Sequence, residues 1–194
     1  MRVSAQIYLA TILYVLLAAS CASTGVIPGE NAKILKNLAG EYFTVAGAYA
    51  NTKQYDKAIE YYRLAARDKN YHTAARYEMA RMNAFLSRWE DAEKIYADLL
   101  KNDPRNRDIA SSLAYVKAMS RDLAGAESLY RELLVQNEYD RQIYENYIRI
   151  LAAQKKNGEA HEALETYKKL FSLPENADTI AKLEELLTPS SKTP

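Results

Sequence analysis

The sequence is poor in the residues that build reactive sites. It contains one cysteine and two histidines among 194 residues. It carries no glycine-rich phosphate loop, Cys/His cluster, metalloprotease helix motif, nucleophile elbow or calcium loop. His72 and His161 stand alone, and neighbouring carboxylates such as Glu90 and Asp91 are typical of a solvated helix face. The sequence therefore predicts a protein that is not an enzyme, with no catalytic, metal-binding or cofactor-binding residue.

An excess of charge of either sign is also lacking. The chain has 26 Lys and Arg against 25 Asp and Glu. Phosphate contacts require a basic stripe, so nucleic-acid binding is not expected, nor is a purely electrostatic contact with a membrane. With a single cysteine, no disulfide can form within the chain, and no thiol chemistry is available away from that position.

Strand signals and helix breakers are scarce. Only six glycines and five prolines are present, and no alternating apolar stretch is flanked by turn residues. Ala, Leu, Glu, Lys and Arg, all good helix formers, are abundant. We therefore expect an all-α protein, with helices near residues 31–51, 55–68, 73–86, 89–102, 107–120, 123–136, 141–154, 159–171 and 177–187.

Three columns of similar side chains recur along the chain at one constant spacing, 34 positions. They are Ala58, Ala92 and Ala126; Tyr62, Tyr96 and Tyr130; and Tyr55, Trp89 and Leu123. The alanine stands four positions before the tyrosine, so both lie on one helix face, where the small residue lets a partner helix approach. We interpret Trp89 as a core residue of this pattern. The period is too long for a heptad and matches a helix–turn–helix unit stacked on copies of itself.

These columns resemble those of tetratricopeptide (TPR) repeat proteins. The first copy matches the family pattern at Tyr42, Val45, Ala46, Tyr49, Ala58, Tyr62 and Ala65; the second at Met79, Ala80, Ala92, Tyr96, Leu99 and Pro104; the third at Leu113, Ala114, Ala126, Tyr130 and Leu133. The second copy departs from the pattern at Arg76 and Asn83, where the family has aromatic residues. The resemblance implies a TPR-type solenoid of helical hairpins with about four repeats.

The fourth copy is predicted to be shifted. Ala163 and Tyr167 follow Ala126 and Tyr130 by three positions more than the regular period, which indicates an inserted helical turn near residues 154–158. We expect a solenoid over residues 31–187, with repeats at about 39–72, 73–106, 107–140 and 141–175. Residues 177–187 would form a capping helix with apolar positions Ile180, Leu183, Leu186 and Leu187, and residues 188–194 a disordered tail.

Residues 1–20 form a separate segment at the start of the chain. Arg2 gives a positive start, residues 7–19 are almost wholly apolar, and small residues lead into Cys21, as in an export signal. The segment resembles a bacterial lipoprotein signal, since Ala19, Ser20 and Cys21 match its lipobox, although Ala18 stands where leucine is usual. The resemblance implies removal of residues 1–20, acyl chains such as palmitate on Cys21, and a tether over residues 21–30.

That resemblance also implies a place in the cell. The lipid on Cys21 would hold the protein in the bacterial cell envelope, and Ala22 favours the outer membrane where the organism has one. Two alternatives stay open at this point. Ordinary cleavage after Ala22 would release the protein, and an uncleaved segment over residues 3–19 would be an anchor helix.

In TPR proteins the first helix of each repeat lines a concave groove. Projected onto this chain, the candidate groove-binding residues are Phe43, Tyr77, Arg81, Phe85, Tyr115 and Arg149, beside Gly47, Ala50, Ser111, Met119 and Glu145. Aromatic residues with arginine are typical of binding hot spots, although tyrosine and phenylalanine in helical repeats are also packing residues. Phe43 and Gly47 occupy the places of the Lys and Asn that grip chaperone tails, so that clamp is not expected.

The predicted function is a membrane-anchored scaffold or adaptor. It would bind a partner protein segment in its groove, in the assembly or transport of envelope components. One alternative is an accessory solute-binding TPR lipoprotein of a periplasmic transport system, which could be a homo-oligomer. A second alternative is a self-assembling structural protein.

Overall fold

The computed structural model describes the backbone of residues 30–136 and 139–188, and the side chains from residue 38 onward. The predicted signal segment, Cys21 and the tail after residue 188 therefore lie outside the described residues. The chain divides into two units, Met1–Leu38 and Ala39–Pro194, and the architecture below is that of the second unit.

The described residues form α-helices and one short 3-10 helix, with no strand among them. The elements are α2 (Glu30–Asn51), α3 (Tyr55–Ala65), α4 (His72–Phe85), α5 (Trp89–Asn102), α6 (Arg107–Met119), α7 (Leu123–Gln136), α8 (Arg141–Ala153), α9 (Asn157–Leu170), η1 (Pro174–Asn176) and α10 (Ala177–Leu187). The predicted all-α class is confirmed, and the predicted helix ends agree with these bounds to within three residues.

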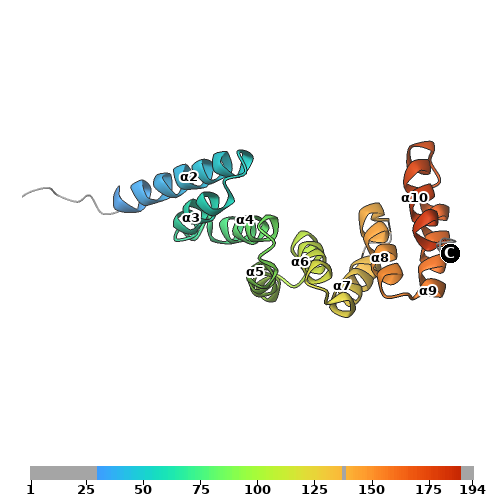
Figure 1. Cartoon of the computed structure of the whole chain (residues 1–194). Helices are drawn as coiled ribbons and strands as arrows, with labels where there is room; N and C mark the ends of the chain where they lie inside the picture. Colours follow the sequence, from blue (N-terminus) through green and yellow to red (C-terminus); the bar gives the residue numbers. More distant parts are fainter. Residues whose placement is uncertain (1–29, 137–138, 189–194) are drawn as a thin grey trace, which may run out of the picture. The chain divides into compact units, whose positions relative to one another are not determined.

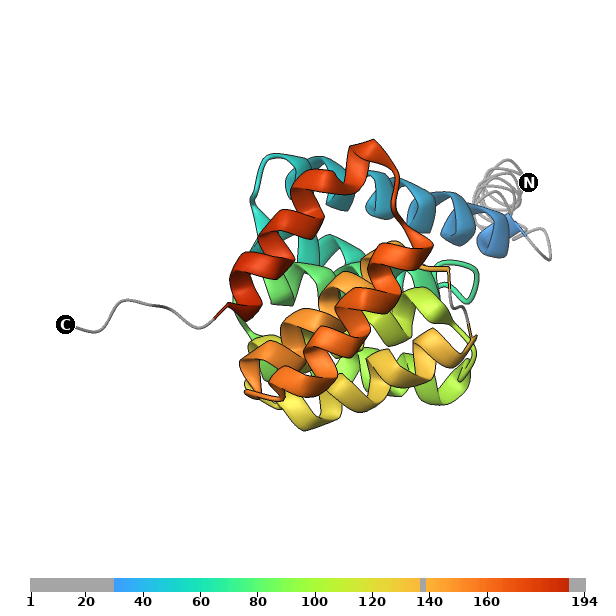
Figure 2. The ribbon, with the colours of Figure 1, turned by 90° about the vertical axis from the view of Figure 1, so that its right-hand side faces the viewer.

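Consecutive helices from α3 to α9 pack against each other as a series of hairpins (Figure 1), and α10 packs on both α9 and α8 (Figure 2). Among the described helices from α3 to α10, extensive contacts join neighbours along the chain, apart from those of α10 with α8. This arrangement is that of a solenoid, in which each repeat buries its apolar face on the next. No helix in the described part of the chain is long and apolar enough to cross a membrane.

The core follows the periodic columns of the sequence. Ala58, Ala92 and Ala126 have no exposed surface, and the three tyrosines of the second column are at most 3% exposed. Each alanine lies in a separate buried cluster that joins adjacent repeats, so the core is a row of small clusters. Trp89 lies against one of these clusters and is half-buried, as expected of a packing residue.

The turn inside each hairpin repeats with the same period. Lys53, Ser87, Arg121 and Lys155 all have a left-handed backbone, with φ of 59°, 56°, 73° and 61°. In each turn the next residue donates its amide to a carbonyl five residues earlier, as Gln54 does to Tyr49 at 2.9 Å and Lys156 to Leu151 at 3.0 Å. These are helix-ending motifs of the Schellman type, in which a left-handed residue stops the helix.

The predicted shift of the fourth repeat is wrong. Its turn at Lys155 follows Arg121 by one regular period, and α9 follows α7 by the same interval, so no helical turn is inserted. The fully buried Ala160 therefore takes the place of Ala126, and Leu164 takes that of Tyr130. The pair Ala163 and Tyr167 repeats the four-residue spacing three positions later, and this coincidence produced the shift.

Two helices on the groove side begin with side-chain caps. Asn106 accepts a hydrogen bond from the amide of Ile109 at 3.2 Å, at the start of α6. Asp140, one period further along the chain, accepts one from the amide of Ile143 at 3.1 Å, at the start of α8. Each cap satisfies an amide that the helix itself leaves without a partner. The caps mark where α6 and α8 begin.

Candidate functional site

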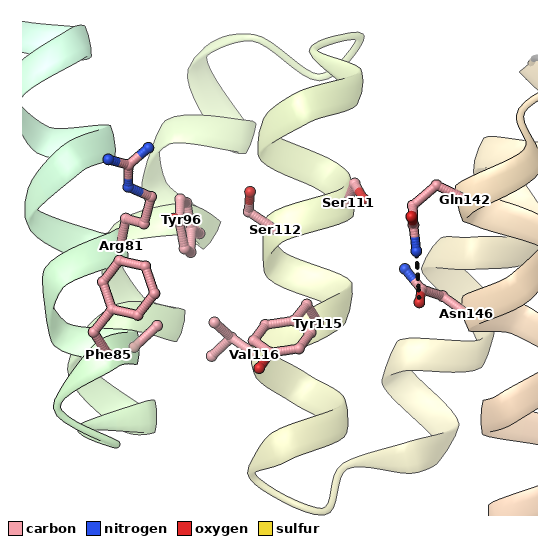
Figure 3. Close-up of a pocket in the computed structure, with 10 residues that line it drawn as sticks. Arg81, Phe85, Tyr96, Ser111, Ser112, Tyr115, Val116, Gln142 and Asn146 are labelled. Carbon is pink, nitrogen blue, oxygen red and sulfur yellow. Dashed lines mark hydrogen bonds between the residues drawn. The ribbon is translucent and has the colours of Figure 1, made fainter.

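A hollow of about 400 Å³ lies where α4, α6 and α8 present their side chains to one side of the hairpin stack (Figure 3). These are the first helices of repeats two, three and four, which is where the TPR pattern places a groove. The lining residues are Arg81, Ala84, Phe85, Tyr96, Ser111, Ser112, Tyr115, Val116, Gln142 and Asn146. We call this hollow the α4–α6–α8 groove.

Four of the predicted groove residues meet there. Arg81 and Phe85 come from α4, and Ser111 and Tyr115 come from α6. Phe85 is 56% exposed although its ring stacks on Tyr55, with 5.1 Å between the ring centroids. Tyr115 is 50% exposed. Large apolar side chains left open on one concave surface are typical of an interaction site.

Arg81 forms an ion pair with the mostly buried carboxylate of Glu78. Its Nη2 atom lies 2.9 Å from Oε2 of Glu78, one helical turn earlier on α4. The Glu78 side chain is 18% exposed, against 48% for Arg81. Burial raises the pKa of Glu78 above its usual value, and the nearby Arg81 opposes that rise. The guanidinium therefore faces the groove, while the carboxylate stays beneath it.

Tyr77 lies beside the groove and does not line it. Its hydroxyl is 3.0 Å from Oγ of Ser112, and its ring meets Tyr96 edge-on with centroids 5.3 Å apart. Burial raises the pKa of Tyr96, and the nearby Tyr77 raises it further. The hydrogen bond between Tyr96 and Ser112 lowers the pKa and so opposes this rise. The three side chains together connect repeat two to repeat three, so Tyr77 acts first as a packing residue.

Phe43 and Arg149 lie elsewhere. Phe43 is half-buried in the first repeat, against Tyr62 at 5.1 Å and Tyr71 at 5.6 Å between ring centroids. Arg149 is exposed on α8 and does not line the groove. Neither residue is brought together with Arg81, Phe85 and Tyr115.

Sequence reasoning missed Gln142 and Asn146, which line the groove from α8. It projected Glu145 and Arg149 into the groove instead, but Glu145 accepts a hydrogen bond from the Tyr167 hydroxyl at 3.0 Å. Asn146 stands one period after Ser112 and, like it, hydrogen-bonds the column tyrosine of the preceding repeat, here Tyr130. The regular period between Ser112 and Asn146 is the sequence signal that could have identified Asn146 as a groove residue.

A second hollow, of about 630 Å³, lies over α3, α4 and α5. It contains several arginines, but two are paired, Arg76 with Asp98 at 2.6 Å and Arg88 with Asp56 at 2.7 Å. The described residues include no group of three His, Cys, Asp or Glu side chains that could hold a metal ion. The α4–α6–α8 groove therefore carries the stronger case for a binding site.

No protein-family model matches the chain. An uncharacterized lipoprotein of Treponema pallidum (strain Nichols) is 33% identical over 154 residues, which cover 79% of each protein. The chain belongs to the family of this treponemal lipoprotein. At that identity and coverage the relationship extends over most of both chains.

Solved structures confirm the predicted TPR fold. MamA from Desulfovibrio magneticus RS-1 matches with a TM-score of 0.64 and 14% identity, over 77% of this chain and 92% of that one. YrrB, described as a TPR protein with an unusual peptide-binding site, matches with a TM-score of 0.57 and 14% identity, over 75% of this chain and 82% of that one. The treponemal relative and this chain thus share a family whose fold here is a TPR solenoid.

Proposed function

We propose that this protein is a lipid-anchored TPR scaffold of the bacterial cell envelope, which binds an extended segment of a partner protein in the α4–α6–α8 groove. The role would lie in the assembly or transport of envelope components. The observation that carries the proposal is the pair of exposed rings, Phe85 and Tyr115, which border one hollow beside Arg81 (Figure 3). A peptide-binding site in a protein of the same fold, YrrB, supports it.

Photocrosslinking in intact cells tests the groove. A photoreactive amino acid replaces Tyr115, and in a control protein it replaces Lys101, which is exposed on α5 and does not line the groove. We expect a discrete adduct with an envelope protein from position 115 only, and its loss when Phe85→Ala is added. The same adduct from both positions would contradict the proposal. An adduct with a second copy only would favour the oligomeric, solute-binding or structural alternatives.

The anchor is tested separately. The treponemal relative is a lipoprotein, and Cys21 is the single cysteine of this chain, at the end of its apolar leader. We expect Cys21→Ser to leave the folded protein soluble after cell breakage, whereas the wild type sediments with membranes and incorporates labelled palmitate. Two or more acyl chains give durable attachment. A mutant that still sediments and needs detergent for release would favour an uncleaved anchor helix.

A further inference from the structure

The groove carries one formal charge. Arg81 is the only ionised side chain among the ten residues that line it, and the others offer apolar surface, hydroxyls or amides. A guanidinium has five N–H donors in a planar fork and no acceptor, and it matches a carboxylate in shape and charge. The charged part of the recognition surface therefore attracts an anion.

The nearby Glu78 does not reverse that preference. Its Oε2 atom is shielded from solvent and accepts no hydrogen bond from the part of the chain that the structure describes, although Arg81 lies 2.9 Å away. A ligand in the groove meets the guanidinium, which is 48% exposed, before it can approach this carboxylate. Because Coulomb attraction falls with distance, the arginine dominates the interaction with a charged group of the ligand.

The other repeats contain no such pair. The position of Glu78 recurs one period later as Ser112 and two periods later as Asn146, and each faces the column tyrosine of the preceding repeat. Neutral groups fill this position in repeats three and four. Only repeat two has a carboxylate there with an arginine three residues on, so the pair distinguishes this end of the groove.

We infer that the groove selects a partner segment with an aspartate or glutamate next to a bulky apolar residue. The carboxylate pairs with Arg81, the apolar side chain packs between Phe85 and Tyr115, and the amides of Gln142 and Asn146 hydrogen-bond the backbone of the segment. This inference rests on the proposed function, since it names the chemistry of the segment bound in the same groove.

A randomised peptide display library, panned on the full chain in detergent, tests the inference. Four proteins are compared: wild type, Arg81→Glu, Tyr115→Ala, and Arg149→Glu as a charge control outside the groove. We expect wild type and Arg149→Glu to enrich peptides with an acidic residue beside an apolar one. Arg81→Glu should lose that acidic residue or replace it with a basic one. Circular dichroism checks that each variant is folded.

One enriched peptide is then compared with its analogue in which Asp is replaced by Asn, by fluorescence anisotropy. We expect the Asn peptide to bind wild type about tenfold more weakly, and both peptides to bind Arg81→Gln equally. Enriched peptides that need Tyr115 but lack an acidic residue, or contain a basic one, would overturn this inference alone. No enrichment on folded wild type would overturn it together with the proposed function.

Discussion

At the scale of single residues, Glu127 is a buried carboxylate that joins repeat three to repeat four. Its side chain is 6% exposed. Oε2 accepts hydrogen bonds from Lys156 Nζ and from Gln154 Nε2, both at 2.7 Å, and Oε1 pairs with Arg131 on the same helix. The hydrogen bond from Lys156 is the largest of the effects that hold the pKa of Glu127 below its ordinary value of 4.5. A carboxylate satisfied in this way stabilises the fold when it is ionised.

We expect Glu127→Gln to lower the free energy of unfolding by about 1–2 kcal/mol at pH 7, because the amide cannot accept these charged hydrogen bonds equally well. A lowered folded-state pKa means that the contribution is present above about pH 4.5 and is lost as the pH falls through the folded pKa. Denaturant-induced unfolding of wild type and Glu127→Gln at pH 7 and at pH 3 measures this difference in the free energy of unfolding. The control is Glu132→Gln, an exposed residue of the same helix. Equal penalties at both pH values would contradict the prediction.

Glu78 should show the opposite pH dependence. Burial raises its pKa, so ionisation costs stability in the folded state. The contribution of protonated Glu78 to the free energy of unfolding is fully present below about pH 4.5. It is lost as the pH rises through the raised pKa. We expect Glu78→Gln to increase the melting temperature at pH 7 by a few degrees, equivalent to about 1 kcal/mol, and to change little at pH 4. A lower melting temperature at pH 7 would show that the Arg81 contact outweighs the cost of burial.

At the scale of the element, each repeat depends on a turn whose key residue is left-handed without being glycine. Lys53, Ser87, Arg121 and Lys155 occupy these positions. A side chain with a Cβ is strained in this region, and glycine is not. We expect Lys53→Gly to stabilise the protein by up to about 1 kcal/mol. The control Glu60→Gly, at an exposed site inside α3, should instead cost about 1 kcal/mol. Destabilisation by both changes would contradict the turn assignment.

These turns explain why the sequence located the helices but not the register of the last repeat. The columns of alanine and tyrosine report buried contacts, and Ala92 and Tyr96 are buried as predicted. Three of the four turn residues are basic, but Lys and Arg also occur at many other positions of the chain, so the period of the turns does not stand out in the sequence. In repeat four Leu164 replaces the column tyrosine, and the only Ala–Tyr pair with the right spacing lies three residues later. The change from tyrosine to leucine at this buried position removed the signal.

The groove was predictable to a similar degree. Arg81, Phe85 and Tyr115 were found because they lie at fixed offsets from the columns on the first helix of each repeat. Gln142 and Asn146 were not found. Asn146 stands one period after Ser112, but Ser112 was itself not assigned to the groove, because a polar residue on a helix has no periodic apolar pattern to indicate the side that it faces. Their position is set by the packing of α8 on α7, which depends on contacts that only the folded chain brings together.

At the scale of the whole molecule, the solenoid has a row of small clusters in place of one central core. Its last repeat has no following repeat to bury its apolar face, so another element must cover that face. Helix α10 does this with Leu183 and Leu187, which are 0% and 5% exposed and pack on the cluster of Ile148, Leu151, Ala160, Leu164 and Tyr167. Lys168 on α9 adds an ion pair with Glu184 at 2.5 Å. Leu186, predicted as a further capping residue, is 46% exposed. The apolar surface of the last repeat is therefore covered by one face of α10.

We expect Leu183→Ala to lower the free energy of unfolding of the region that it covers by about 2–4 kcal/mol, from lost burial and the cavity left behind. Leu186→Ala, on the exposed side of the same helix, should cost less than about 1 kcal/mol. Because stability in a solenoid passes between neighbours only, the loss should be local. Hydrogen exchange should show α8, α9 and α10 losing protection in Leu183→Ala, while α3, α4 and α5 keep theirs. A uniform loss of protection along the chain would contradict this prediction, because it would mean that all the repeats unfold as one cooperative unit. In that case the capping helix would also stabilise the α4–α6–α8 groove, and with it the binding of a partner there.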